Sequence, residues 1–263
     1  MEKIEIRKVE VLRYLQPLRE GGSLPAIVEG DDEFLYVMKF RGAGQGKKAL
    51  VAELIGGEIA RKIGLQVPEL VFLHLDESFS ITEGDEEIQD LLKFSIGLNL
   101  GLHFLSGSIT YDPLVSNADS LSASKVVLLD SIINNIDRTA KNTNLLNWNK
   151  ELWLIDHGAS LYFHHNWPSW EQSLGKGFFG IKDHVLLSKA SELVEAAEII
   201  KDALHREVLE EIVSIIPEEW LEDETSNMNP AERRAAYLAF LEDKIKNIPL
   251  LLKEAEDARK GNI

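Results

Sequence analysis

Three side chains that could bind a metal ion and assist a reaction lie close together in the segment 131–158, SIINNIDRTAKNTNLLNWNKELWLIDHG. Asn142 follows Asp137 by five residues, and Asp156 follows it by nineteen, directly after the apolar run LWLI. Carboxylate and carboxamide oxygens are the hard ligands that Mg²⁺ prefers. One loop can therefore aim a carboxylate at an acceptor hydroxyl while its far end reaches a metal ion, as phosphoryl transfer from a nucleotide requires. The alternative is a capped helix end followed by an ordinary turn rich in Asn and Asp.

The composition limits the classes of function. The 263 residues are enough for one large domain or two lobes with a substantial core. With 28 basic and 44 acidic residues the net charge is −16, which argues against a general binding surface for nucleic acid or anionic lipid. The lack of cysteine excludes disulfides, thiolate catalysis and cysteine zinc sites, and it favours a cytoplasmic location. We find neither a signal peptide nor an apolar run of about 18 residues, so we expect no membrane span.

The first third of the chain has the patterns of strands, interrupted by one helix. Apolar residues at helical spacing predict the helix within 42–65, and Gly64 is expected to end it. The acidic stretch 76–90 is expected to form an exposed loop. Strands are predicted in the segments 3–15, 25–30, 33–40, 66–75 and 91–105.

The remainder of the chain is predicted to be mainly helical. The segment 122–135 has apolar residues at helical spacing, and two short strands, 143–148 and 151–156, follow it. After residue 185 the helical pattern dominates, and a capping box at Asn229 marks one helix start. We therefore predict an α+β protein in a single domain over residues 1–263, with a strand-rich N-lobe (1–105) and a helical C-lobe (106–263).

The motifs resemble a known family. The sequence DRTAKN followed by LIDHG resembles the catalytic loop and metal-binding segment of the HipA-like kinases. Its D-R-x-x-x-N form is also similar to the phosphatidylinositol 3- and 4-kinases. Upstream, GGSLPAIVEGDDEFLYVMKF resembles the phosphate loop, a hairpin and the strand with the ATP-binding lysine, and AELIGGEIARKIGLQVPEL resembles the helix that follows. The resemblance covers about residues 18–165 and implies a bilobal protein-kinase-like fold with the nucleotide between the lobes.

The resemblance implies roles in binding ATP and Mg²⁺. Lys39 would pair with the ATP phosphates, and Glu53 would hold Lys39 in position. Asn142 and Asp156 would be the magnesium ligands. Gly21, Gly22 and Ser23 would cover the phosphates, and the adenine-binding hinge would lie within residues 102–108.

The resemblance also implies the groups that carry the reaction. Asp137 would be the catalytic base, Lys141 would add positive charge near the transferred phosphoryl group, and Arg138 would support the catalytic loop. The chain departs from the full-length HipA toxins because it is shorter and shows no separate serine-bearing activation loop. Ser23 is then either a site of autophosphorylation, which would repel nucleotide, or a turn residue.

Several alternatives stay open at this stage. Lys39 could be an edge-strand lysine, Glu58 competes with Glu53 for the pairing role, and His157, His164 and His165 raise a zinc site as an alternative. We predict an ATP- and magnesium-dependent serine/threonine protein kinase that transfers the γ-phosphate to a hydroxyl. The other functions considered are a small-molecule or phosphoinositide-type kinase and a nucleotide-binding pseudokinase that regulates a partner protein. The sequence does not identify the acceptor, the oligomeric state or a toxin role.

Overall fold

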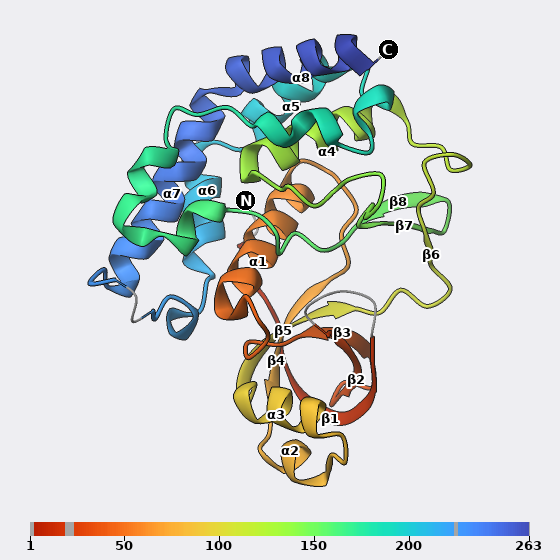
Figure 1. The fold of residues 1–263 in the computed structure, drawn as a ribbon, viewed down its shortest axis with the longest axis vertical. Helices are drawn as coiled ribbons and strands as arrows, with labels where there is room; N and C mark the ends of the chain where they lie inside the picture. Colours follow the sequence, from red (N-terminus) through yellow and green to blue (C-terminus); the bar gives the residue numbers. More distant parts are fainter. Residues whose placement is uncertain (1–2, 19–23, 224–225, 263) are drawn as a thin grey trace.

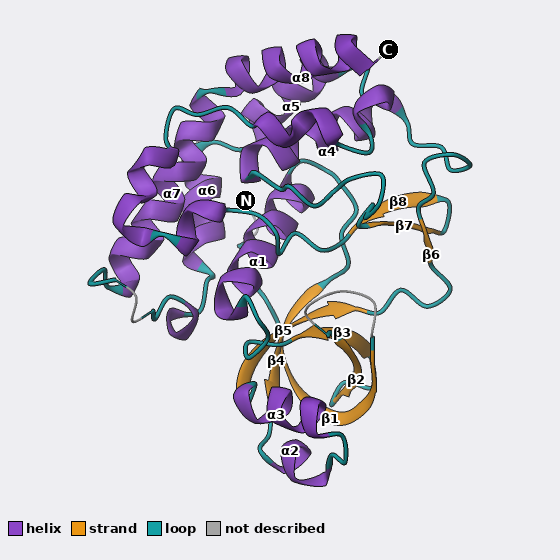
Figure 2. Cartoon of the chain, viewed as in Figure 1, coloured by secondary structure: helices purple, strands orange, loops and turns teal. Residues whose placement is uncertain are grey.

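The computed structural model describes residues 3–18, 24–223 and 226–262, drawn as a ribbon in Figure 1. The predicted phosphate-loop residues Gly21, Gly22 and Ser23 lie outside the described residues. Most strands gather in a barrel at one end of the molecule and most helices gather at the other end, as Figure 2 shows. The predicted α+β organisation in two lobes is confirmed.

Five N-terminal strands form a closed barrel in the order β1-β2-β3-β5-β4. Neighbouring strands are antiparallel, except that β1 and β4 are parallel. Tyr36 and Met38 of β3 point into the barrel core, so the next residue, Lys39, points to the opposite face of the strand. The strands are β1 (Lys8–Pro17), β2 (Ala26–Gly30), β3 (Leu35–Lys39), β4 (Leu70–Leu75) and β5 (Gly97–His103).

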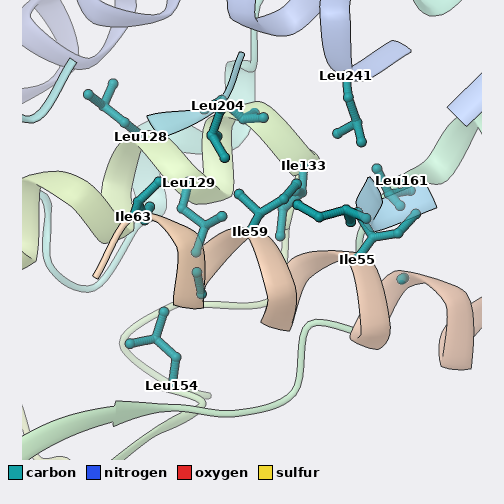
Figure 3. Packing of buried hydrophobic residues seen from close by; sticks show 14 of the residues in the cluster. Ile55, Ile59, Ile63, Leu128, Leu129, Ile133, Leu154, Leu161, Leu204 and Leu241 are labelled. Carbon is teal, nitrogen blue, oxygen red and sulfur yellow. The ribbon is translucent and has the colours of Figure 1, made fainter. Parts of the chain in front are cut away.

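Helix α1 (Gly46–Lys62) connects β3 to β4 and lies between the barrel and the helical lobe (Figure 1). Its residues from Leu50 to Ala60 are buried. Figure 3 shows its apolar side chains, among them Ile59, packing with side chains of α4 (Ser120–Ile133) in one core cluster. The predicted helix and its end are confirmed, because Gly64 has a φ of +76°, a conformation that glycine adopts without strain.

The expected loop at 76–90 is wrong, and so is the start of the strand expected at 91–105. Two helices, α2 (Ser78–Thr82) and α3 (Glu86–Phe94), occupy this stretch, and β5 begins only at Gly97. The Asp85 carboxylate caps α3 by accepting hydrogen bonds from the two backbone amides of residues 87 and 88. Because carboxylates are favourable at helix N-termini, the acidic run starts a helix here, and Ile88 and Leu92 bury its apolar face against the barrel.

The predicted strand pair and the helix before it are confirmed. Strands β7 (Leu145–Trp148) and β8 (Glu151–Leu154) form a hairpin, and β6 (Ile109–Thr110) adds a third strand. The two turn residues, Asn149 and Lys150, have φ angles of +50° and +69°. Positive φ at both positions matches the twist of the flanking strands. Helix α4 and this hairpin flank the segment that contains Asp137 and Asn142.

The C-terminal lobe is helical, as predicted. Asn229 and Glu232 form the expected capping box at the start of α7. Between β8 and α5 the chain forms short 3-10 turns, which are η1 (Tyr162–His165), η2 (Trp167–Ser173), η3 (Phe179–Asp183) and η4 (Leu187–Lys189). The remaining elements are α5 (Leu193–Ala203), α6 (Arg206–Ser214), η5 (Glu218–Trp220), α7 (Pro230–Lys246) and α8 (Ile248–Asn262).

Contacts between the lobes hold α1 against the helical lobe. Lys48 at the start of α1 pairs with Asp223 at 2.8 Å, and Lys62 at its end pairs with Glu211 at 3.4 Å. Trp220 of η5 is buried, and its indole Nε1 donates to the Leu98 carbonyl of β5 at 3.1 Å. The helical lobe thus fixes both ends of the helix that contains Glu53.

Candidate active site

Lys39 stands at the centre of a group of charged side chains from both lobes. Its Nζ lies 2.6 Å from Glu53 Oε2 of α1 and 2.6 Å from Asp156 Oδ1, which follows β8. Of the two glutamates that the sequence offered, Glu53 pairs with Lys39 and Glu58 lies 3.3 Å from Arg61. Three of the predicted site residues, distant in sequence, are therefore brought together.

The electrostatics of this group keep Lys39 and Glu53 charged. Burial would lower the pKa of the Lys39 ammonium, but the charges of Asp156 and Glu53 outweigh it and hold that pKa above its usual value. Burial would raise the pKa of Glu53, yet the charge of Lys39 and a hydrogen bond from His157 keep it well below its usual value. A permanently charged ammonium next to a half-exposed carboxylate can bind an anionic ligand, because that carboxylate can be replaced as its partner.

The backbone around Asp156 is fixed by contacts with α1. Asp156 has a left-handed φ of +58°, and the next amide, of His157, donates to Glu53 Oε2 at 2.7 Å. His157 is buried, and its Nδ1 lies 3.4 Å from Glu53 Oε1. A β-carbon placed on Gly56 would lie only 2.7 Å from His157 Cβ, so glycine allows this close approach. Glu53 therefore positions both Lys39 and the segment that begins at Asp156.

Asp137 is held by two carboxamides from its own loop. Its Oδ2 accepts from Asn142 Nδ2 at 2.8 Å and from Asn144 Nδ2 at 3.3 Å. Because the amide nitrogen of Asn142 points at Asp137, its amide oxygen is the group left to meet a cation. Asp137 is partly exposed, and Lys141 and Asn142 are exposed.

The same loop is anchored in the core through Arg138. Arg138 Nε donates to Asp130 Oδ2 of α4 at 2.6 Å, and both side chains are fully buried. The Arg138 guanidinium also donates to the Asn144 carbonyl and, at 3.3 Å, to the Ile155 carbonyl. Because Ile155 precedes Asp156, Arg138 joins the loop of Asp137 to the segment of Asp156. Arg138 thus lies in the core, where it supports the loop.

Asp130 has two further partners that the sequence analysis did not single out. His184 Nε2 donates to Asp130 Oδ2 at 2.9 Å, and His184 Nδ1 accepts from the Leu186 amide at 3.1 Å. Asn135 Nδ2 donates to Asp130 Oδ1 at 3.1 Å, while Asn135 Oδ1 accepts from the Asp137 amide at 3.1 Å. Burial would raise the pKa of Asp130, but the Arg138 charge and the His184 hydrogen bond keep it well below its usual value.

The sequence contains one signal for this anchor. Asp130 interrupts the apolar run VVLLDSII of a helix that is otherwise buried, and a carboxylate in such a place needs a partner. His184 gave no such signal, because it lies in a stretch of short turns without periodicity. The loop that carries Asp137 is thus held by α4 and by a segment more than forty residues downstream.

The alternative of a zinc site gains no support. Over the ranges that the structure describes, no three His, Asp or Glu side chains are grouped to hold a metal ion. His164 Nδ1 and the Tyr237 hydroxyl share a hydrogen bond of 2.9 Å, and the His164 ring packs edge-on against His165. Across the same ranges, no helix combines the length and apolar character needed to cross a bilayer.

Solved structures share this fold. The crystal structure of the Helicobacter pylori proinflammatory kinase CtkA matches with a TM-score of 0.51 and 11% identity, covering 98% of this chain and 99% of that one. The Golgi casein kinase matches with a TM-score of 0.50 and 12% identity, covering 97% of this chain and 74% of that one. The structure of the Golgi casein kinase with Mn/ADP bound matches with a TM-score of 0.51 and 11% identity, covering 98% of this chain and 75% of that one. The architecture is therefore the bilobal protein-kinase-like fold that the resemblance implied.

The family follows from the sequence itself. The family model of the HipA-like kinases matches residues 10–247, which is most of the chain. No curated protein matches the sequence. The chain belongs to the HipA-like kinase family, and it is a kinase.

Proposed function

We propose that this kinase transfers the γ-phosphate of ATP to a hydroxyl in a reaction that depends on Mg²⁺, with serine or threonine on a protein as the acceptor. The observation that carries the proposal is the contact of Lys39 with both Glu53 and Asp156, next to the anchored loop of Asp137. A cation for phosphates, a buried carboxylate that orients it and a half-exposed carboxylate that can bind a metal are the parts that phosphoryl transfer uses.

Asn142 and Asp156 have the chemistry that a magnesium ion needs. They offer one carboxamide oxygen and one carboxylate, both hard ligands, and magnesium in kinases commonly completes its shell with waters and nucleotide phosphates. Bound there, Mg²⁺ would neutralise charge on the transferred phosphoryl group. The Golgi casein kinase with Mn/ADP bound supports this proposal, as a protein of the same fold that binds a nucleotide and a divalent cation.

The remaining roles are assigned to side chains of the loop and of the N-lobe. Lys39 binds the phosphates, Asp137 orients the acceptor hydroxyl and accepts its proton, and Lys141 adds positive charge from its exposed position. Arg138 keeps the loop in place from the core. Gly21, Gly22 and Ser23, which lie outside the described residues, cover the phosphates in this proposal.

We also propose that residues 1–263 act as one kinase domain with the lobes divided between residues 105 and 106. The chain leaves the barrel at the end of β5 and reaches the three-stranded sheet at β6. This connection, within residues 102–108, is the segment proposed to bind adenine.

The test is ADP release and phosphate incorporation by purified protein with ATP and Mg²⁺, with and without a mixture of candidate acceptor proteins. Asp137→Ala should lower turnover by about 10²- to 10⁴-fold, as loss of a catalytic base does, and should leave nucleotide affinity within about threefold. Lys39→Met should instead weaken nucleotide binding. Asp257→Ala is the matched control, because Asp257 is an exposed carboxylate that pairs with the exposed Lys253 on α8.

The outcomes separate the candidate functions. ADP release by wild type that Asp137→Ala abolishes establishes a kinase, and phosphate found on serine or threonine of a protein establishes the acceptor class. Phosphate found only on small molecules or lipids would show that the acceptor is a small molecule or lipid and not a protein. Nucleotide binding without turnover under all these conditions contradicts phosphotransfer and leaves a nucleotide-binding regulatory module.

A further inference from the structure

Lys244 of α7 is a fully buried lysine with no role in the chemistry described so far. Its Nζ lies 2.9 Å from Asn134 Oδ1, 2.8 Å from the Lys176 carbonyl oxygen and 5.4 Å from the centre of the Phe240 ring. An ammonium has three N–H groups and no acceptor. The two oxygens and the ring face therefore provide one acceptor for each N–H of the charged form.

The first acceptor places Lys244 next to the catalytic loop. Asn134 ends α4 in the left-handed conformation, with φ of +55°. The next residue, Asn135, is the one that bonds Asp130 and the Asp137 amide. Because Lys244 holds the side chain of Asn134, it acts on the point where the chain leaves α4 and enters the loop of Asp137.

The second acceptor belongs to a short segment, 175–178, whose backbone is held by three charged side chains. The Gly175 amide donates to Asp243 at 2.7 Å, the Lys176 carbonyl accepts from Lys244, and the Phe178 amide donates to Glu254 at 2.7 Å. A β-carbon at residue 177 would overlap the Glu254 carboxylate, so a larger residue there would have to displace that side chain. Helices α7 and α8 thus fix this segment at successive backbone groups.

The segment 175–178 leads directly back to the catalytic loop. It continues through η3 to His184, which bonds Asp130 and pairs with Thr139 in an isolated β-bridge. The Val185 amide also donates to the Arg138 carbonyl at 3.1 Å. Lys244 therefore contacts both segments that hold the loop of Asp137, namely the end of α4 and the segment that leads to His184.

We propose that Lys244 is a positioning residue for phosphotransfer, whose ammonium fixes the loop of Asp137 by binding Asn134 and the Lys176 carbonyl at the same time. This inference rests on the proposed function of Asp137. Lys244 acts through these backbone and amide groups and does not touch the reacting atoms.

The charge of Lys244 changes within an accessible pH range. Burial lowers its pKa to about 8, although Asp243 of the same helix and Glu254 of α8 raise it. The α4 side offers only the uncharged Asn134, and the segment 175–178 offers a carbonyl. A neutral amine has two N–H groups for three acceptors, so its hold on the loop weakens as pH rises through about 8.

The stability of the folded protein should rise with pH over the range in which activity falls. Because the pKa of Lys244 in the folded protein lies below the ordinary value of 10.5, the folded protein releases this proton before the unfolded chain does. The unfolded chain then binds more protons than the folded one between about pH 8 and 10.5, and this group favours folding more as pH rises. A loss of activity with a gain in stability is a signature that a purely structural lysine would not produce.

The experiment compares wild type with Lys244→Met, which keeps an unbranched side chain of similar length and removes the charge. Lys253→Met on the exposed side of α8 is the control. At pH 7 Lys244→Met should lower kcat by about ten- to a hundredfold, the range expected for small displacements of a catalytic group, and leave the KM for ATP within about twofold. Wild-type kcat should fall across pH 8, the kcat of Lys244→Met should stay level there, and the wild-type melting temperature relative to the variant should rise.

Hydrogen exchange gives a readout independent of turnover. Peptides covering 130–140 and 174–186 should exchange faster in Lys244→Met than in wild type, and faster in wild type at pH 9 than at pH 7 after correction for intrinsic rates. If Lys244→Met does not fold, the comparison of wild-type exchange at pH 9 and at pH 7 tests the proposal. Unchanged exchange in these peptides, or parallel pH profiles of the two proteins, overturns the role of Lys244. A wild type without turnover at any pH overturns the proposed function instead.

Discussion

Glu53 and Asp130 are both completely buried carboxylates with a cationic partner, one near each end of the site, but their surroundings differ. Lys39, the partner of Glu53, retains 15% exposure and shares its charge with Asp156, which is 47% exposed. Arg138 and His184, the partners of Asp130, are 0% and 2% exposed. One carboxylate therefore belongs to a group that opens to solvent, and the other to a closed network.

The difference shows how a buried charge can serve two purposes. Moving a charge out of water costs several kcal/mol, and a buried pair recovers this only when its hydrogen-bonding groups are well satisfied. The Asp130 carboxylate accepts hydrogen bonds from Arg138, His184 and Asn135, so its network fixes a backbone conformation. Around Lys39 one side of the network ends at a half-exposed carboxylate, so a ligand can enter without opening the core. Removing each carboxylate in turn should show which network fixes the backbone and which one serves ligand binding.

Asp130→Ala should have the largest effect. It leaves the Arg138 guanidinium buried without its carboxylate, and breaking a buried pair from one side typically costs about 3–5 kcal/mol. The free energy of unfolding, measured with urea, should fall by that amount, and turnover should be lost with it. Asp257→Ala, which removes an exposed carboxylate, should stay within about 0.5 kcal/mol of wild type. A loss below about 1.5 kcal/mol for Asp130→Ala would contradict the anchoring role.

Glu53→Gln should separate activity from stability. Lys39 keeps Asp156 and some contact with water, so the free energy of unfolding should fall by about 1–3 kcal/mol, less than for Asp130→Ala. Turnover should still fall by about a hundredfold, because the ammonium loses the group that orients it. Glu58→Gln is the matched control on the same helix, since Glu58 is also buried but contacts Arg61. Equal losses of turnover in Glu53→Gln and Glu58→Gln would contradict a role of Glu53 in the active site.

The same contrast explains which parts of the site could be predicted from sequence. Lys39 ends a strand and Glu53 lies in a strongly periodic helix, so local patterns place both elements, and the resemblance pairs them. Asp137 and Asn142 share one short loop, where spacing alone limits their separation. These residues were predicted because each depends on local structure or on a motif. The structure brings the predicted Lys39, Glu53 and Asp156 into contact.

The closed network could not be predicted in the same way. His184 bonds Asp130 across 54 residues, and it lies among short 3-10 turns whose sequence has no periodicity. Nothing in a sequence indicates which of several buried carboxylates a single histidine will meet. The error at 76–90 has a different physical cause, because acidic residues favour both exposed loops and helix N-termini. There the Asp85 cap, and the burial of Ile88 and Leu92, decided in favour of a helix.

Gly56→Ala should have the smallest effect and tests the link between the two regions. Alanine is a better helix former than glycine, so propensity alone would stabilise α1 by about 0.5–1 kcal/mol. The new methyl group would lie 2.7 Å from His157 Cβ, which forces α1 and the segment after Asp156 apart. We therefore expect a loss of turnover of about three- to tenfold, since Glu53 bonds the His157 amide, with little change in melting temperature. Gly44→Ala is the control, because among the described residues, its two chain neighbours aside, no atom lies within 4 Å of its β-carbon position. If Gly56→Ala raises the melting temperature and keeps full turnover, the contact between α1 and His157 does not position the site.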